Sequence, residues 1–429
     1  MRESKLWALA LASLVLAAGV VAGCGDDDEE EPAGEEASFD LVIGDLVPLT
    51  GDLADFGPPG RKAADLAVEE INKAVQEVGA EHNVSIKHED DQTDAQAGVS
   101  AARKLISADN AACIAGSWAS DVSIPVARSV TSREQVLQIS PASTSDDITA
   151  LEDNGFMNRT PPPDKFQGPA VADVIEQEVD GAQGKTVNIG ARNDAYGTNL
   201  AETFTTAWEG KGGQIGEEVI YDPEQPSYDS EADQITSGNP DAIVIIDFPE
   251  TYNKVGPALV RTGNFDTEKT FVTDGLFSSE LPASAGRRAT EGIRGSFPGS
   301  PDAGAAAEGF DQLFKQAGGP KERQAFDAQN FDAVILCYLS AVAAGRAEGR
   351  AMADQVRGVS GPPGDKFTYL QLADAIRALQ DGNDIDYEGA SGPIDMNEDG
   401  DPTAGVYDLF EFRGGKPEIF DEVPLQIEQ

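Results

Sequence analysis

The sequence has few of the side chains that build most catalytic and metal sites, with two histidines and three cysteines among 429 residues. A Ser-His-Asp or Cys-His device would need one of the histidines, and both His82 and His88 lie in a polar segment that is typical of a protein surface. The chain contains no GxSxG, GxxxxGKS/T or HExxH motif, and so few histidines and cysteines make no convincing zinc site. We therefore predict that the protein is not an enzyme and carries no metal or cofactor.

Positive charge is also scarce, because 31 Lys and Arg stand against 76 Asp and Glu and give a formal net charge of −45. Such a surface would be repelled by the phosphates of nucleic acid and by anionic lipid. We therefore expect no nucleic-acid partner, whereas a cationic or zwitterionic small molecule is compatible with this charge.

The first cysteine, Cys24, ends an apolar run that follows Arg2 and Lys5. This layout is that of a signal peptide, and the run is too short for a mature membrane span. The sequence VAGC at residues 21–24 also resembles a bacterial lipobox, in which the cysteine becomes the new N-terminus and carries lipid. We therefore predict a signal peptide at residues 1–23, a lipid anchor to the membrane at Cys24, and an extracytoplasmic location in the cell envelope.

The other two cysteines, Cys113 and Cys337, both lie in apolar segments. Export permits a disulfide between them, and two buried free thiols fit the sequence at least as well. The segment 24–38 is acidic and has no large apolar side chain, so it cannot offset the entropy cost of ordering. We predict a flexible linker there, followed by roughly 390 residues, which are too many for one compact core and suit two domains.

From Phe39 onward, short β-rich runs alternate with longer helical patterns, which predicts parallel sheets with helices on both faces. A proline-rich segment at residues 158–163 interrupts this alternation, which then restarts. Two further crossings between domains are indicated near residues 297–299 and 389–393. We predict an α/β protein of two doubly wound, Rossmann-like lobes joined by three hinge crossings. Lobe 1 comprises residues 39–162 and 299–390 in this prediction, and lobe 2 comprises residues 163–298 and 391–429.

Polar side chains follow several predicted strands at the edge where open α/β sheets bind their ligands. Residues 116–121 (GSWASD) follow one strand and residues 140–145 (SPASTS) follow the next, so that their hydroxyl and N–H groups form a cradle for a carboxylate. Asp274 closes a strand of the second half, where its carboxylate could meet an ammonium group. The segment 395–400 (DMNEDG) matches half of a calcium loop but lacks the glutamate at position twelve, and we interpret it as a β-turn.

Several segments have the order and spacing of a known protein family. They are GDLVPLTG at 44–51, Phe56-Gly57, DDQTD at 90–94, ISPAST at 139–144, NDAYG at 193–197 and YEGASGPI at 387–394. In these the chain resembles the leucine/isoleucine/valine-binding family of solute-binding proteins over nearly all of residues 39–429. The resemblance implies the type I periplasmic-binding (Venus-flytrap) fold and delivery of a solute to the separate permease and ATPase subunits of an ABC importer. We expect the chain to act as a monomer.

The resemblance also implies how an α-amino acid would be held between the lobes. Ser120 and Thr144 would bind the α-carboxylate, and Ser143 lies next to Thr144 in the second of the two loops. The carbonyl of Ala142, the hydroxyl of Thr144 and the carboxylate of Asp274 would take the α-ammonium group.

The pocket for the ligand's side chain follows from the same resemblance. Tyr196 would close over the ligand from lobe 2, and Phe56 would form an aromatic wall. The family's branched-chain binders carry an aromatic residue after the strand that ends here at Ile246, and this chain has Asp247-Phe248. Phe248 facing inward would keep the pocket apolar, whereas Asp247 facing inward would favour a polar or cationic side chain.

Three alternative functions are compatible with the sequence. The same fold could bind urea, a short amide or another small organic solute such as an aromatic acid, and a neutral solute would not need Asp274. The protein could also be a ligand sensor that signals through a membrane partner. A secreted enzyme that uses a pair of carboxylates is the third alternative, from a different class.

Overall fold

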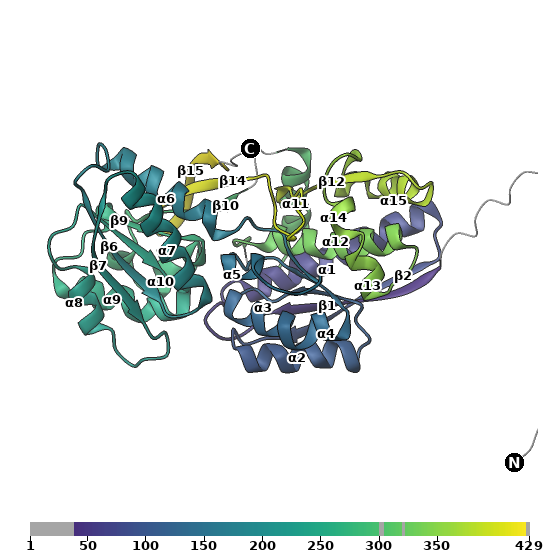
Figure 1. The fold of residues 1–429 in the computed structure, drawn as a ribbon, viewed down its shortest axis with the longest axis horizontal. Helices are drawn as coiled ribbons and strands as arrows, with labels where there is room; N and C mark the ends of the chain where they lie inside the picture. Colours follow the sequence, from purple (N-terminus) through teal and green to yellow (C-terminus); the bar gives the residue numbers. More distant parts are fainter. Residues whose placement is uncertain (1–37, 300–303, 320–321, 426–429) are drawn as a thin grey trace, which may run out of the picture. The chain divides into compact units, whose positions relative to one another are not determined.

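The computed structural model describes residues 38–299, 304–319 and 322–425. The predicted signal peptide, the lipid anchor at Cys24 and the predicted linker up to residue 37 lie outside the described residues. Within the described part of the chain, no helix is both long enough and apolar enough to cross a membrane. The two larger sheets form the centres of two α/β lobes (Figure 1).

The sheet of lobe 1 has five strands in the order β2-β1-β3-β4-β5, and every neighbouring pair is parallel. Its strands are rich in apolar residues because helices cover both faces, and Leu41 and Ile43 of β1 are fully buried. The predicted parallel sheet is therefore confirmed. The strands are β1 (Phe39–Val47), β2 (His82–Asp90), β3 (Cys113–Gly116), β4 (Leu137–Ser140) and β5 (Met157–Arg159).

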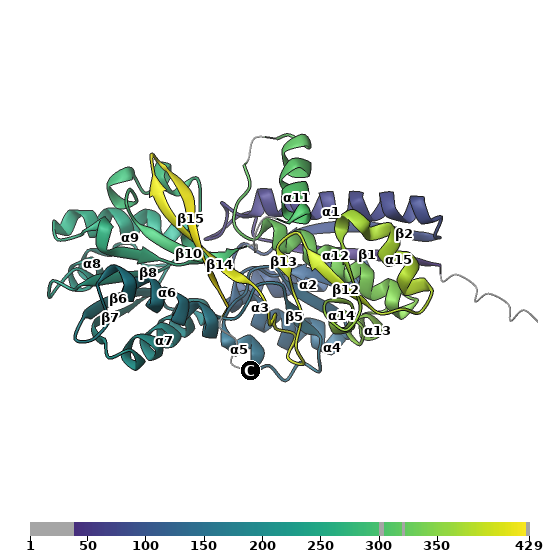
Figure 2. The ribbon, with the colours of Figure 1, turned by 90° about the horizontal axis from the view of Figure 1, so that it is seen from above.

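Helices cover this sheet on both faces (Figure 2). Helices α1 and α12 pack on one face with Ile43 and Leu137, and α2 and α3 pack on the other with Leu46 and Ile114. The helices of lobe 1 are α1 (Gly57–Val78), α2 (Ala95–Ser107), α3 (Ser120–Val126), η1 (Ala127–Thr131), α4 (Ser132–Glu134), α5 (Asp146–Thr149), α11 (Ala305–Gln316), α12 (Asp327–Ala344), α13 (Gly349–Ala353), α14 (Val356–Val359), η5 (Tyr369–Gln371) and α15 (Leu372–Gln380). A small third sheet consists of β11 (Asp365–Thr368), β12 (Ile385–Gly389) and β13 (Gly392–Pro393).

The sheet of lobe 2 has seven strands in the order β15-β14-β10-β9-β8-β6-β7. The five strands β7, β6, β8, β9 and β10 run parallel to one another. Strand β14 pairs with β10 in antiparallel orientation, and β15 pairs with β14 in the same way. Helices α6 and α7 lie on one face, and α8 and α9 lie on the other (Figure 2). The strands are β6 (Thr186–Arg192), β7 (Gln214–Tyr221), β8 (Ala242–Ile246), β9 (Thr270–Val272), β10 (Arg294–Gly299), β14 (Val406–Arg413) and β15 (Lys416–Pro424). The helices are α6 (Asp164–Glu178), α7 (Ala195–Gly210), α8 (Asp229–Ile235), α9 (Pro249–Thr262), η2 (Thr267–Lys269), η3 (Asp274–Leu276), α10 (Leu281–Ser284) and η4 (Arg287–Ala289).

The chain passes between the lobes after β5, after β10 and again between β13 and β14. The last passage includes the predicted turn at residues 395–400. The amide N–H of Gly400 donates to the carbonyl of Asn397 at 3.1 Å, and the Asn397 side chain accepts hydrogen bonds from the N–H groups of Asp399 and Asp401. The interpretation of this segment as a β-turn is therefore confirmed.

A disulfide joins Cys113 of β3 to Cys337 of α12, with a Cα–Cα distance of 6.0 Å. Both cysteines are fully buried on the face of the sheet that α1 also covers. Of the two possibilities that the sequence left open, the disulfide is the one found. It fixes the sheet to a helix that lies 224 positions later in the sequence.

The two histidines are not surface residues, so that expectation was wrong. His82 is buried, stacks on Phe39 with ring centroids 4.0 Å apart, and lies 2.9 Å from the hydroxyl of Tyr338. His88 lies between two carboxylates, with Nδ1 2.7 Å from Asp45 and Nε2 2.9 Å from Asp65. The residues next to both histidines in the sequence are polar and gave no indication of these partners, which come from other elements of the lobe.

Replacing His88 with glutamine is expected to destabilise the protein by about 2–3 kcal/mol at pH 6. Burial alone would lower the pKa of His88, but the hydrogen bonds and charges of Asp45 and Asp65 raise it to about 9. Because the folded-state pKa exceeds the unfolded value, the stabilisation is complete below pH 6.5 and disappears as the pH rises through about 9. Urea unfolding across this range measures it, with exposed Lys87→Gln on the same strand as the control. A pH-independent loss would contradict the charged pair.

Candidate functional site

A narrow cavity, with free space for about one water molecule, lies between the carboxyl ends of the two sheets. Six of the nine predicted binding residues line it, namely Phe56, Ser120, Ala142, Tyr196, Phe248 and Asp274. Leu53, Trp118, Ala119, Gly275 and Phe326 complete the lining. Ser143, Thr144 and Asp247 are buried but do not belong to the lining residues.

Serine hydroxyls hold the two loops of lobe 1 together beside the cavity. The Ser143 hydroxyl lies 2.8 Å from the Ser123 hydroxyl and donates to the Trp118 carbonyl at 3.0 Å. The Ser120 hydroxyl, which lines the cavity, accepts a hydrogen bond from the N–H of Ser145 at 3.2 Å. Thr144 is buried, and its hydroxyl makes no hydrogen bond. The two loops of the predicted cradle therefore lie together, with the Ser143 hydroxyl bonded within lobe 1 and the Thr144 hydroxyl close to the Asp164 side chain.

Asp274 is the one acidic residue among the cavity-lining residues, and it follows β9 as predicted. The Tyr196 hydroxyl donates to Asp274 Oδ1 at 2.8 Å and lies 2.7 Å from the Thr273 hydroxyl. Burial raises the pKa of Asp274 to about 6, so the carboxylate is mostly ionised at pH 7. Tyr196 reaches this position because the side chain of Asp194 caps α7 by accepting from the N–H of Gly197.

The structure separates the two residues that follow β8. The Phe248 ring lines the cavity and stacks on Tyr196 with centroids 5.1 Å apart. Asp247 instead accepts a hydrogen bond from the Tyr221 hydroxyl at 2.9 Å and one from its neighbour's N–H at 2.8 Å. Burial raises the pKa of Asp247 to about 7 against the charge of Arg192. The cavity wall at this point is therefore apolar.

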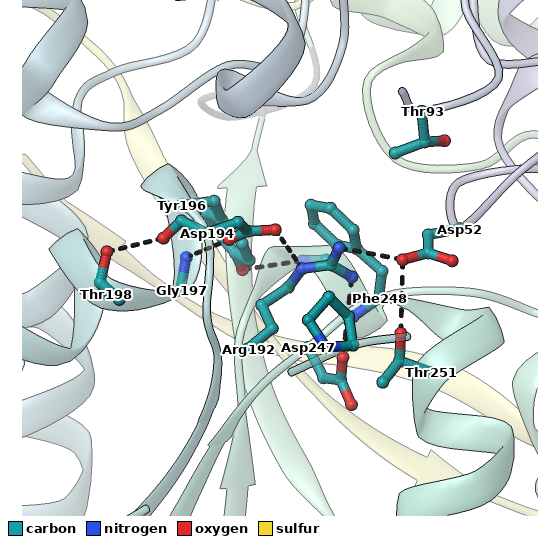
Figure 3. A network of polar contacts seen from close by, with 12 residues as sticks. Asp52, Thr93, Arg192, Asp194, Tyr196, Gly197, Thr198, Asp247, Phe248 and Thr251 are labelled. Atoms are coloured by element: carbon teal, nitrogen blue, oxygen red, sulfur yellow. Dashed lines mark hydrogen bonds and ion pairs between the residues drawn. The ribbon is translucent and has the colours of Figure 1, made fainter. Parts of the chain in front are cut away.

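Asp52, in the loop after β1 of lobe 1, contacts Arg192 and Thr251 of lobe 2 beside the Phe248 ring (Figure 3). Asp52 forms an ion pair with Arg192 at 2.9 Å, and the Thr251 hydroxyl donates to the same oxygen at 3.4 Å. The Arg192 guanidinium lies 3.7 Å from the centroid of the Phe248 ring. A second contact joins the Ser278 hydroxyl to Asp55 at 2.6 Å. Arg192 therefore takes part both in one of the contacts between the lobes and in the packing of the cavity wall.

Replacing Asp52 with asparagine is expected to weaken ligand binding by about 3- to 10-fold, mainly through faster dissociation. The pair joins the two lobes, so its loss lowers the population of the state in which they enclose the cavity. The effect is modest because the Asp52 side chain is 33% exposed. Stopped-flow binding measures it. Glu250→Gln, an exposed carboxylate next to Thr251 in the sequence, is the matched control. An equal effect of both variants would contradict a specific role for the Asp52 pair.

Sequence reasoning missed Leu53, Trp118 and Phe326 in the cavity wall. Trp118 belongs to residues 116–121, which the sequence had already singled out, and Leu53 lies between two of the segments that carried the family resemblance. Phe326 precedes α12 in a left-handed conformation, with φ of 66°, and reaches the cavity from a distant part of the chain without any local signal. Among the described residues, no group of three or more His, Cys, Asp and Glu side chains is arranged to hold a metal ion.

The chain is similar in sequence to known proteins. Its residues 40–415 match the model of a protein family that is described as periplasmic binding protein. A Leu/Ile/Val-binding protein homolog of Brucella melitensis is 29% identical over 386 residues, which are 89% of this chain and 93% of that protein.

Solved structures show the same fold. The branched-chain amino acid transporter substrate-binding protein LivJ of Streptococcus pneumoniae, in complex with isoleucine, superposes with a TM-score of 0.72 at 17% identity, covering 90% of this chain and 99% of that one. A solute-binding protein of an ABC transporter from Rhodopseudomonas palustris, in complex with 3,4-dihydroxybenzoic acid, superposes with a TM-score of 0.67 at 18% identity. The superposition covers 90% of this chain and 98% of that one.

Proposed function

The chain belongs to the periplasmic binding protein family, and from this premise we propose that it is a branched-chain-type member that binds an amino acid with an apolar side chain for an ABC importer. The family is extracytoplasmic, and the named relatives and structural neighbours are binding proteins rather than enzymes. The secreted-enzyme alternative is therefore dropped, and the choice of ligand becomes the question.

The observation that carries the proposal is the lone carboxylate of Asp274 in a cavity whose lining contains no lysine or arginine. Such a site attracts an ammonium group. The Ser120 and Thr144 hydroxyls and neighbouring N–H groups are available for the α-carboxylate, and the carbonyl of Ala142 completes the ammonium site in this proposal.

The remaining wall selects an apolar side chain in this proposal. Phe56 and Phe248 line it, and Asp247 is directed elsewhere. An aromatic acid is the second candidate, because the wall is rich in aromatic rings and one structural neighbour was solved with 3,4-dihydroxybenzoic acid. Its carboxylate would however be repelled by Asp274, whereas a zwitterion meets both the acidic and the hydroxyl side of the cavity.

The wider setting is also part of the proposal. We expect lipidation at Cys24, a monomer tethered to the membrane, and docking onto separate permease and ATPase subunits after the lobes close on the ligand. In this proposal two lobes move relative to each other. Lobe 1 comprises residues 39–162 and 299–390, and lobe 2 comprises residues 163–298 and 391–429. A sensor that signals through a membrane partner would use the same binding site, and measured uptake in a deletion strain separates the two roles.

Thermal unfolding of the chain without residues 1–24, refolded to remove carried-over ligand, tests the ligand class. The twenty amino acids, urea, acetamide and 3,4-dihydroxybenzoate form the panel. A ligand at 100 times its Kd stabilises the folded state by about 2.7 kcal/mol, so a clear Tm rise is expected with aliphatic or aromatic amino acids. A rise only with the benzoate, or only with urea or acetamide, would refute the proposal.

A further inference from the structure

A second carboxyl group, Asp164, lies beside the ammonium site proposed at Asp274. It is the first residue of α6, directly after the first crossing, and it is completely buried. Its N–H donates to the carbonyl of Thr144 at 2.8 Å, which places it against the predicted carboxylate cradle. Neither oxygen of its side chain makes a well-aligned hydrogen bond, although the Thr144 hydroxyl lies close enough to oppose part of the rise in its pKa. Buried polar groups are nearly always hydrogen-bonded in native proteins, so this one requires an explanation.

Other oxygens near Asp164 or Asp274 also lack well-aligned partners. The Thr144 hydroxyl, Gln167 Oε1 and the Tyr407 hydroxyl are also buried without hydrogen-bond partners. The charges of Asp274 and Asp146 repel that of Asp164, and Arg159 is the cation that acts on it. The Arg159 guanidinium is already paired with the buried carboxylate of Asp401 at 2.7 Å. Two buried carboxyl groups therefore share one region without a cation of their own.

Such a pair cannot ionise fully without a large electrostatic cost. Burial first, and then the charge of Asp274, raise the pKa of Asp164 well above its ordinary range. The pKa of Asp274 itself is raised to about 6 by burial. The pKa values of the nearby Tyr196 and Tyr407 hydroxyls are raised by burial and by both carboxylates, so neither tyrosine supplies the missing proton at neutral pH.

We propose that Asp164 and Asp274 form one proton-linked unit, in which Asp164 stays a neutral carboxylic acid and Asp274 receives the ammonium group of the ligand. As an acid, Asp164 can donate one hydrogen bond, for example to the neighbouring Thr144 hydroxyl, which gives both groups a partner. The part that concerns the ammonium group rests on the proposed function, whereas the protonation of Asp164 does not. Binding of a zwitterion at acidic pH must then displace a proton from the pair, so affinity falls as the pH drops.

The variant Asp164→Asn tests the protonation without any ligand. A carboxyl group whose pKa is raised on folding lowers stability as the pH rises from its unfolded value through its folded value. Asparagine has the shape of the neutral acid and keeps the backbone hydrogen bond, so the variant should lose this slope and have a Tm about 2–5 °C higher at pH 7.5. Asp180→Asn, an exposed aspartate just beyond the other end of α6, is the control. An unchanged slope for Asp164→Asn would overturn the proposal.

Binding of L-isoleucine between pH 5 and 8 tests the link to the ligand. Wild-type affinity should fall by up to tenfold per pH unit below about pH 6. Asp164→Asn should retain the affinity at pH 7.5 within a few-fold and show the fall at lower pH, because Asp274 loses a repelling neighbour. Calorimetry of the wild type at pH 5.5, in buffers of different ionisation enthalpy, should detect proton release on binding and does not depend on any variant.

The outcomes separate the two proposals. Binding of L-isoleucine with the same pH profile in wild type and Asp164→Asn, or without proton release at pH 5.5, would overturn the linkage and leave the proposed function standing. Failure of the wild type to bind any of the twenty amino acids would overturn the proposed function and the ammonium part with it.

Discussion

Replacing Asp274 with asparagine is expected to weaken binding of an amino acid by about 100- to 1,000-fold. Asp274 is 2% exposed and is the only acid among the cavity-lining residues. Asparagine has nearly the same shape and still accepts the hydrogen bond of the Tyr196 hydroxyl, so the change isolates the charge. An enclosed ammonium group would then have no counter-charge within the cavity, and the loss corresponds to about 3–4 kcal/mol.

The same variant distinguishes the classes of ligand by the sign of its effect. Affinity for a neutral amide or urea should be almost unchanged, and affinity for a benzoate should rise because a repelling charge is gone. Tyr196→Phe is the graded comparison, since it removes the 2.8 Å hydrogen bond to Asp274 but keeps the charge and the ring, and about 3- to 10-fold weaker binding is expected. Isothermal titration with L-isoleucine, acetamide and benzoate measures all three. Unchanged affinity for L-isoleucine in Asp274→Asn would exclude the ammonium site.

Much of this site could be predicted because its residues follow strands. In a parallel sheet the carboxyl ends of neighbouring strands meet at one edge, so Ser120 after β3 and Ala142 after β4 lie together in lobe 1. Asp274 follows β9 in the sheet of lobe 2, and it reaches the same cavity because the carboxyl ends of the two sheets face each other. The alternation of strand and helix was strong enough to identify these strands. The segments that carried the family resemblance supplied Phe56 and Tyr196.

Other parts of the site had no such signal. Strand β8 is buried along its whole length, so its pattern of apolar residues carried no information about which of Asp247 and Phe248 would face the cavity. Phe248 faces the cavity because the Asp247 carboxylate is bound on the other side by the Tyr221 hydroxyl and lies near the Arg192 guanidinium. Asp164 follows a run of prolines that indicated only a crossing, and the charged and polar groups that act on it, Asp274 and Tyr407 among them, lie far away in the sequence.

The chain crossings themselves are held by an ion pair that the sequence did not reveal. Arg159 at the end of β5 and Asp401 in the passage between β13 and β14 are both fully or almost fully buried, at 0% and 1% exposure of their side chains. The guanidinium also donates to the carbonyls of Ser143 and Ser145, at 3.3 and 2.8 Å, in the loop beside the cavity. One arginine thus joins two of the three crossings to the predicted carboxylate cradle.

Replacing Arg159 with methionine is therefore expected to reduce both stability and binding. The Asp401 carboxylate would remain buried without its partner, which costs about 3–5 kcal/mol. The loop at Ser143 and Ser145 would lose its donors as well, and we expect amino-acid affinity to fall by about tenfold. Urea unfolding and titration calorimetry measure the two losses. Lys165→Gln is the control, because Lys165 lies 3.7 Å from the same carboxylate but is 43% exposed, so its removal should cost less than about 0.5 kcal/mol.

The double variant Arg159→Met/Asp401→Leu separates the two roles of the arginine. Replacing a buried ion pair by apolar side chains of similar volume is often neutral for stability, since no charge is left without a partner. Stability should therefore recover in the double variant, whereas the carbonyls of Ser143 and Ser145 would still lack their donor and the affinity would stay low. Recovery of affinity together with stability would show that Arg159 acts on the binding site only through the overall stability of the fold. A persistent loss of affinity in a stable double variant would identify Arg159 as a positioning residue for the loop that receives the ligand.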